Sequence, residues 1–246
     1  MSSTLPEEIL DLIVDHLRND RTALKACCLV SQPWVPRTRR HLFARVEFDV
    51  IKQSSFESWM KTFPDPSTSP ARHARTLMIS GSALITITSP DASAWLRSFH
   101  LVEQLVVDTA RHRDGKISLV QLCGLSSNLR SLGVTYSIVP PSEVFGLICS
   151  FPLLEDLYLS SYGPTRDADG WDAPLALPKF TGLRLYGHIP AVTRRLLDIR
   201  GGLCISRLTV TCHVAEDFES VINLASGCSE TLEFLRIRCS RSGAFR

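Results

Sequence analysis

A pattern of apolar positions recurs along most of the chain at nearly constant spacing. Each copy has an apolar residue, two variable residues, a leucine, one variable residue and a second apolar residue. The central leucines are Leu77, Leu105, Leu132, Leu157, Leu183, Leu208 and Leu235, separated by 28, 27, 25, 26, 25 and 27 residues. A fixed period of this size is typical of repeat architectures, in which each period is one supersecondary unit.

Each copy of the pattern predicts a short strand. Because side chains alternate between the two faces of a strand, the central leucine and the apolar residue two positions later face one side. The residues between and after them face the other side. One unit cannot bury its apolar edge alone, so successive units are expected to stack. Val46 and Phe48 repeat the spacing 31 residues before Leu77 and predict a further strand there.

Helix-compatible segments lie between the predicted strands, at residues 142–149, 191–199 and 215–225. In the last segment, apolar residues recur at helical spacing. They are Phe218, Val221, Ile222 and Ala225. Strands alternating with helices predict the α/β class, here as a curved repeat solenoid whose parallel strands line the concave side. Residues 44–246 therefore resemble the leucine-rich repeat superfamily in a degenerate form.

The chain departs from that family at the position five residues after each central leucine. The family places Asn or Cys there, where the side chain satisfies backbone groups. This chain has Ser82, Ala110, Ser137, Tyr162, His188, His213 and Ser240. We expect a solenoid without a regular asparagine ladder, and a Gly-, Pro- and Asp-rich loop over residues 162–178 that bulges from it.

The first 43 residues follow a helical pattern instead. An apolar stripe at helical spacing predicts the first helix. The stripe consists of Ile9, Leu10, Ile13, Val14 and Leu17. Asp20 can cap a second helix over residues 21–28, and Ser31 a third helix around Trp34. Because Pro33 and Pro36 crowd the third helix, we expect it to start late or to be irregular.

These residues resemble an F-box. The resemblance covers residues 4–43 and rests on Leu5-Pro6-Glu7-Glu8-Ile9-Leu10, Ile13, Leu17, Leu24, Cys28-Leu29-Val30-Ser31 and Trp34. It implies an F-box domain at residues 1–43 that binds the Skp-type adaptor of a cullin-RING (SCF) ubiquitin ligase. The residues that it places on the adaptor-binding face, or in support of it, are Leu5, Pro6, Ile9, Leu10, Ile13, Leu24, Val30 and Trp34.

The two parts together resemble fungal F-box proteins with degenerate leucine-rich repeats. The resemblance implies a substrate-recognition subunit that serves ubiquitin-dependent protein degradation. The adaptor and, through it, a cullin would bind at one end, and a protein substrate would bind the solenoid. The alternative is a leucine-rich-repeat binding scaffold unconnected to ubiquitination, whose N-terminal helices only cap the solenoid.

Composition and charge are consistent with a globular protein-binding chain. Of 246 residues, 44% are hydrophobic and 21% are charged, which is ordinary for a globular protein. A net charge of +2 is too small for general attraction to nucleic acid or to an anionic membrane. The N-terminus shows no signal-peptide pattern, and no apolar run is long enough to span a membrane, so we expect a cytoplasmic or nuclear protein.

Sequence motifs for catalysis are missing. The chain has no P-loop, dinucleotide-binding, nucleophile-elbow or zinc-protease motif, and its eight cysteines include no C-x-x-C pair. Cys212 and His213 are adjacent on a predicted strand and would point to opposite faces, which does not suit proton transfer. Cys212 and Cys239 are expected to lie close across neighbouring strands as free thiols. We therefore expect no enzyme activity, no metal and no cofactor.

The concave face is the predicted binding surface. Its early strands offer Met78, Val106, Asp108 and Thr135. Its later strands offer the candidate substrate-binding residues Tyr158, Arg184, Tyr186, Arg207, Arg236 and Arg238. Arginines beside tyrosines can bind a carboxylate or phosphate next to an apolar anchor. An acidic or phosphorylated protein segment is therefore expected there, with ordinary solvated side chains as the alternative.

The last predicted strand lies close to the C-terminus, with no helix after it. A repeat array exposes an apolar end unless something caps it. Either a partner covers that end or the chain is a shortened version of a longer protein.

Overall fold

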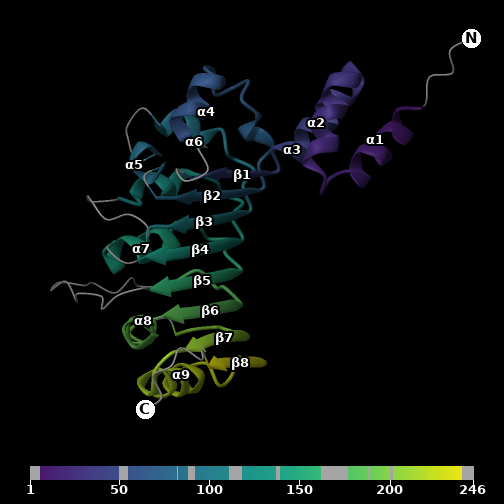
Figure 1. The fold of residues 1–246 in the computed structure, drawn as a ribbon. Coiled ribbons are helices and arrows are strands. Elements are labelled where there is room, and N and C mark those ends of the chain that lie inside the picture. Colours follow the sequence, from purple (N-terminus) through teal and green to yellow (C-terminus); the bar gives the residue numbers. More distant parts are fainter. Residues whose placement is uncertain are drawn as a thin grey trace, which may run out of the picture.

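The computed structural model describes residues 6–49, 55–81, 83–87, 92–110, 118–136, 139–161, 177–187, 189–199 and 202–239. Within this part, eight strands form one open parallel sheet in which each strand is bonded to the next one along the chain. The strands are β1 (Arg45–Phe48), β2 (Thr76–Ser80), β3 (Gln104–Asp108), β4 (Ser131–Tyr136), β5 (Asp156–Ser161), β6 (Gly182–Gly187), β7 (Arg207–Cys212) and β8 (Phe234–Cys239). Figure 1 shows them stacked from β1 to β8. The predicted α/β class and the parallel strand direction are confirmed.

The register of the sheet follows the leucine period. Leu77 pairs with Leu105, and the pairing continues from strand to strand as far as Leu208 with Leu235. Val46 of β1 pairs with Leu77, as its spacing predicted. A near-constant period thus places equivalent residues of successive units side by side across the sheet.

Helices follow most of the strands and cover the leucine side of the sheet. They are α4 (Phe56–Thr62), α5 (Ala83–Ile87), α6 (Ser93–Arg97), α7 (Pro141–Cys149), α8 (Ile189–Leu197) and α9 (Ala215–Gly227), with 3-10 turns η2 (Pro70–His73) and η4 (Val120–Gly124). Helices α7, α8 and α9 confirm the three predicted segments. The leucine rows and the apolar side chains of these helices form one continuous core. The opposite side of the sheet carries no helix in the described part of the chain; we call it the open face.

The inward residues of the last strand are less buried than those of the strand before it. Leu208 and Val210 of β7 are fully buried, whereas Leu235 and Ile237 of β8 are 44% and 40% exposed. Helix α9 buries Val221 and Leu224, but Ile222 is 63% exposed, so the predicted apolar stripe of this helix is only partly buried. In the described part of the chain both β1 and β8 are edge strands, but β1 buries its inward Val46 and Phe48, whereas β8 leaves its inward residues partly exposed.

The N-terminal region forms helices α1 (Glu7–His16), α2 (Arg21–Val30) and α3 (Val35–Leu42), with the 3-10 turn η1 (Gln32–Trp34) before α3. Figure 1 shows α1 and α2 standing away from the sheet, while α3 adjoins it near β1. Helix α3 ends at Leu42 and β1 begins at Arg45. Between them, the Phe43 ring packs edge-on against Trp59 and Phe63 of the next segment, at 5.9 and 6.1 Å between centroids. The junction between the helices and the sheet is therefore short and packed.

Two sequence predictions fall mainly outside the described part of the chain. Residues 162–176 of the predicted bulging loop lie there. Of the seven residues five positions after each central leucine, only Ala110 and His213 are described.

Candidate protein-interaction surfaces

The three N-terminal helices are held together by a small core. Val14 of α1 and Leu24 and Cys27 of α2 are buried, as is Thr38 of α3. The Asp20 carboxylate accepts hydrogen bonds from the backbone N–H groups of residues 22 and 23, so it caps α2 as predicted. So small a core leaves most side chains of α1 and α2 in solvent.

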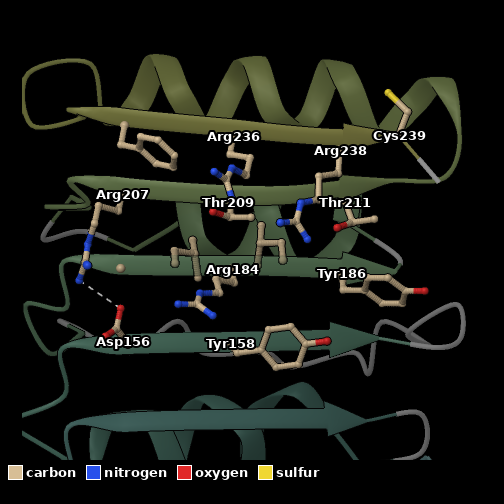
Figure 2. A pocket seen from close by; sticks show the side chains of 14 residues that line it. Asp156, Tyr158, Arg184, Tyr186, Arg207, Thr209, Thr211, Arg236, Arg238 and Cys239 are labelled. Atoms are coloured by element: carbon tan, nitrogen blue, oxygen red, sulfur yellow. Dashed lines mark hydrogen bonds and ion pairs between the residues drawn. The ribbon is translucent and has the colours of Figure 1, made fainter.

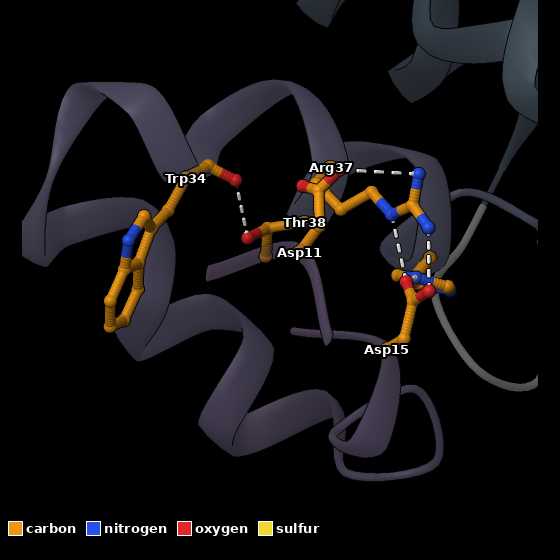
Figure 3. Close-up of polar contacts among 6 residues, drawn as sticks. Asp11, Asp15, Trp34, Arg37 and Thr38 are labelled. Atoms are coloured by element: carbon orange, nitrogen blue, oxygen red, sulfur yellow. Dashed lines mark hydrogen bonds and ion pairs between the residues drawn. The ribbon is translucent and has the colours of Figure 1, made fainter. Parts of the chain in front are cut away.

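An ion-pair cluster connects α1 with α3 (Figure 3). Arg37 donates from Nε and a terminal nitrogen to the two oxygens of Asp15, at 2.8 and 2.5 Å. The Nε2 atom of His41 lies 2.7 Å from the same carboxylate, and Asp11 lies 3.6 Å from Arg37. The hydrogen bonds from Arg37 and then from His41 hold the pKa of Asp15 well below its ordinary value. This carboxylate therefore links α1 to two residues of α3.

Helix α3 has the irregular start that its prolines predict. The segment begins with the 3-10 turn η1, which contains Pro33, and Pro36 falls in the first turn of α3, where its missing N–H is tolerated. Ser31 precedes the turn but makes no capping hydrogen bond with its side chain. The Thr38 hydroxyl donates to the carbonyl oxygen of Trp34 at 2.6 Å, which joins the turn to the helix (Figure 3).

The residues predicted to bind an adaptor differ in exposure. Ile9 and Ile13 are 42% and 39% exposed on one face of α1, and Val30, at the end of α2, is 71% exposed. Pro6 is also exposed, Leu10 and Trp34 are half-buried, and Leu5 lies outside the described residues. Leu24 is fully buried, so it cannot touch a partner and acts only as support for the exposed residues.

Two further exposed apolar residues belong with this group. Leu12 is 57% exposed and Leu29 is 88% exposed. We call Ile9, Leu12, Ile13, Leu29 and Val30 the α1–α2 apolar residues. Leu12 follows Ile9 by three residues and so lies near it on the surface of α1. It is not part of the apolar stripe, so the helical pattern did not mark it as a candidate for adaptor binding.

The open face of the sheet is organised in rows across the strands. One row runs through Tyr158, Arg184, Thr209 and Arg236, and a second through Ser160, Tyr186, Thr211 and Arg238. A third contains Asp156, Gly182, Arg207 and Phe234. The structure therefore brings all six predicted substrate-binding residues onto one face and into adjoining rows.

These residues line a shallow hollow of about 740 Å³ over strands β5 to β8. Figure 2 shows the arginine and tyrosine side chains on the side of the sheet that faces away from the helices. The lining also contains Thr209, Thr211, Phe234 and Asp156, which were not among the residues predicted from the sequence. Their repeat positions match those of the selected residues, so the period itself was the signal that could have identified them.

The charges in the hollow are unequal. Four of its lining residues are arginines, and Asp156 is the one acidic residue among those that line it. Arg207 donates to Asp156 at 3.2 Å, so that carboxylate already has a cation. The Arg236 guanidinium lies 5.5 Å from the centroid of the Phe234 ring. No hydrogen bond or ion pair joins Arg184 or Arg238 to another described residue. The hollow is therefore a surface of excess positive charge.

Two tyrosines border the arginines. The Tyr158 ring lies over Gly133 of β4, where a Cβ atom would stand 3.6 Å from the ring, an ordinary van der Waals contact. Tyr186 packs edge-on against His213, with 4.8 Å between the ring centroids. The hollow therefore has aromatic surface on the side toward β5.

Cys212 and Cys239 pair in register across β7 and β8, as predicted, and both are free thiols. Cys212 is buried, and burial, followed by the proximity of Asp217 and Cys239, raises the pKa of its thiol to about 11. A thiol with so high a pKa is a poor nucleophile at neutral pH. Across the residues with a defined position, no cluster of three or more potential metal ligands occurs, and no helix has the length and apolarity needed to cross a membrane.

The chain matches no model of a known protein family, and no curated protein matches it.

Proposed function

We propose that this protein is a substrate-recognition subunit of an SCF-type ubiquitin ligase. In this proposal, residues 1–43 are an F-box that binds the Skp-type adaptor, and residues 44–246 are a leucine-rich-repeat-like solenoid that binds a protein substrate. The protein acts by proximity: it holds the substrate near the ligase, and other subunits carry out ubiquitin transfer.

The observation that carries the proposal is the exposure of the α1–α2 apolar residues. Val14, Leu24 and Cys27 are buried between the helices, yet Leu29 and Val30 are 88% and 71% exposed. Helices with so many exposed apolar residues gain stability when a partner covers them. The sequence positions of Ile9, Ile13 and Val30 match those at which the F-box resemblance expects adaptor contacts.

The junction between the helices and the sheet supports the same function. The chain passes from α3 to β1 through residues 43 and 44 alone, and Phe43 is packed among aromatic rings. A flexible linker would let a bound substrate drift relative to the adaptor. A packed junction holds it in one direction, as transfer to a particular lysine requires.

A second candidate function is a binding scaffold without a ligase. It is favoured by the contact of α3 with η2, which places a helix over the β1 end of the sheet, as a terminal cap would lie. The α1–α2 apolar residues argue against this alternative, because a cap would bury its apolar residues against the sheet.

Co-expression with a Skp-type adaptor, followed by affinity purification, tests the proposal. The wild-type chain should retain the adaptor. The double substitution Ile9→Asp with Leu29→Asp should lose it, because two charges would then enter an apolar interface. The matched control is Val120→Asp on η4, which is 63% exposed on the sheet domain and should leave adaptor binding unchanged.

Circular dichroism and thermal denaturation should give the same spectrum and midpoint for all three chains, since the substituted residues are exposed. Failure of the wild-type chain to bind any Skp-type adaptor would favour the scaffold. Equal retention by the double variant would show that the α1–α2 apolar residues are not the docking surface.

A further inference from the structure

We propose that the part of the hollow that lies over β6 to β8 is a phosphate-binding site, which takes a phosphorylated serine or threonine of a protein partner. The site is centred on Thr209 and bounded by Arg184, Arg236 and Arg238. The site itself is inferred from the residues of the hollow. Only the role of the partner, as a substrate for ubiquitination, rests on the proposed function.

The spacing of the arginines suits one tetrahedral anion. Thr209 lies between Arg184 and Arg236 in the same row. Neighbouring strands are about 4.8 Å apart, so the α-carbons of these two arginines lie roughly 10 Å apart, with the threonine midway. Arg238 follows Arg236 by two residues and faces the same side. Figure 2 shows the three guanidinium groups around Thr209 and Thr211.

The donors in the hollow match a phosphate better than a carboxylate. A phosphate monoester carries about −1.5 to −2 charges and three acceptor oxygens, and each guanidinium can donate two parallel hydrogen bonds. Three arginines can therefore each bind one edge of the phosphate, while the Thr209 hydroxyl donates to an oxygen. A single carboxylate has two oxygens and one charge, so it would leave about two of the three guanidinium charges unneutralised, whereas a phosphate leaves about one.

The rest of the open face favours a phosphorylated protein segment over nucleic acid. Arginines gather on β6 to β8, whereas Arg45 of β1 stands apart, two residues from Glu47 on the same side. Between these two regions, β2 and β3 present Met78, Val106 and Asp108. A polyanion needs a row of basic residues along its length. One phosphate flanked by uncharged residues needs only a local cluster, and the Tyr158 ring above Gly133 offers an apolar contact for the residue next to the phosphate.

Arg207 is not one of the arginines that we assign to phosphate binding. Its guanidinium is bound by Asp156 at 3.2 Å, and this pair forms the border of the hollow at the amino ends of the strands. The two opposite charges cancel, so this pair adds no net positive charge to the site near Thr209.

The test is fluorescence anisotropy with three labelled peptide pools whose flanking positions are random and whose central residue is phosphoserine, aspartate or serine. The phosphoserine pool should bind at least tenfold more tightly than the serine pool, and inorganic phosphate should compete with it. Arg184→Ala and Arg236→Ala should each weaken binding about tenfold, the loss expected for a charged hydrogen-bonding pair. Thr209→Val, which keeps the shape of the side chain, should weaken binding by a smaller factor.

The matched control is Arg45→Ala, an arginine on the open face of β1 outside the hollow, which should bind the phosphoserine pool like the wild type. Equal binding of the aspartate and phosphoserine pools would overturn the phosphate assignment in favour of a general acidic segment. Binding to single-stranded RNA or to phosphatidylserine vesicles with no preference among the peptide pools would overturn the protein partner. The anisotropy assay contains no adaptor. If the wild-type chain retains the adaptor in the co-purification but does not bind the phosphoserine pool, the result counts against this inference and not against the proposed function.

Discussion

Arg207 of β7 and Asp156 of β5 form an ion pair across the intervening strand β6, with 3.2 Å between the guanidinium nitrogen and the carboxylate oxygen (Figure 2). The residue between them in the row is Gly182. A Cβ atom at this position would overlap the carboxylate oxygen of Asp156 and approach the Arg207 guanidinium to 3.5 Å. The contact thus depends on a strand residue without a side chain.

Gly182→Ala should abolish this ion pair at little cost in stability. Both side chains are about half exposed, so the free energy of unfolding should fall by at most about 1 kcal/mol. The measurement is a double-mutant cycle of Arg207→Ala and Asp156→Ala by urea denaturation. The coupling free energy should vanish in the Gly182→Ala background and persist in Gly133→Ala, whose Cβ meets only ordinary contacts. An equal coupling in both backgrounds would contradict the role given to Gly182.

Asp15→Asn should weaken the N-terminal helices and change their response to acid. Because the folded-state pKa of Asp15 lies below its ordinary value, the carboxylate stabilises the fold above that value, and the contribution is lost as the pH falls through the folded-state pKa. At neutral pH the variant should lose about 1 kcal/mol of unfolding free energy, the usual size for a partly exposed charged pair.

Thermal denaturation between pH 2 and pH 7 checks this prediction. The wild-type chain should lose stability more steeply than Asp15→Asn in the acid range, so the two curves should converge there. Asp11→Asn is the control, because Asp11 lies 3.6 Å from Arg37 and makes no hydrogen bond to it. A variant curve parallel to the wild type throughout would show that Asp15 contributes nothing to the pH dependence.

The strand register was predictable because the leucines recur in phase. With Leu132, Leu157 and Leu183 separated by 25 and 26 residues, each unit has nearly the same length, and equal units place equal positions side by side. The burial of the N-terminal helices was less predictable. Helical spacing puts Leu10, Ile13 and Val14 on one stripe, but three short helices can bury only part of it, and the structure buries Val14 while leaving Ile13 exposed.

The candidate site shows the same limit. Alternation of faces correctly placed Arg184, Tyr186 and Arg236 together, because it depends only on strand direction. The pairing of Arg207 with Asp156 joins residues 51 positions apart and depends on the glycine between them. No local pattern marks such a pair. Comparison of equivalent positions in units two periods apart would reveal it, since residues 156, 182 and 207 occupy one row.

Substitutions along the leucine row should differ in cost according to burial. Leu132→Ala removes a fully buried side chain from the middle of the core and should lower the free energy of unfolding by about 2–5 kcal/mol. Leu235 has the same row position on β8, where it is 44% exposed. Leu235→Ala should therefore lower the free energy of unfolding by only about 1 kcal/mol. Urea denaturation of both variants gives the comparison. Equal losses would mean that another part of the protein covers Leu235 in solution.

Cys212 and Cys239 should differ sharply in their reaction with iodoacetamide, although they pair in adjacent strands. Cys239 is exposed, whereas Cys212 is buried and its thiol pKa is raised to about 11, so at pH 7.5 almost none of it is thiolate. Mass spectrometry of the folded protein should show Cys239 alkylated first and Cys212 protected. Exposed Cys204 serves as a second reactive reference. In urea both cysteines should react at similar rates, because unfolding removes the burial that raises the pKa. Rapid alkylation of Cys212 in the folded protein would show that β8 detaches from β7, since loss of that strand is the direct way to bring this thiol into water.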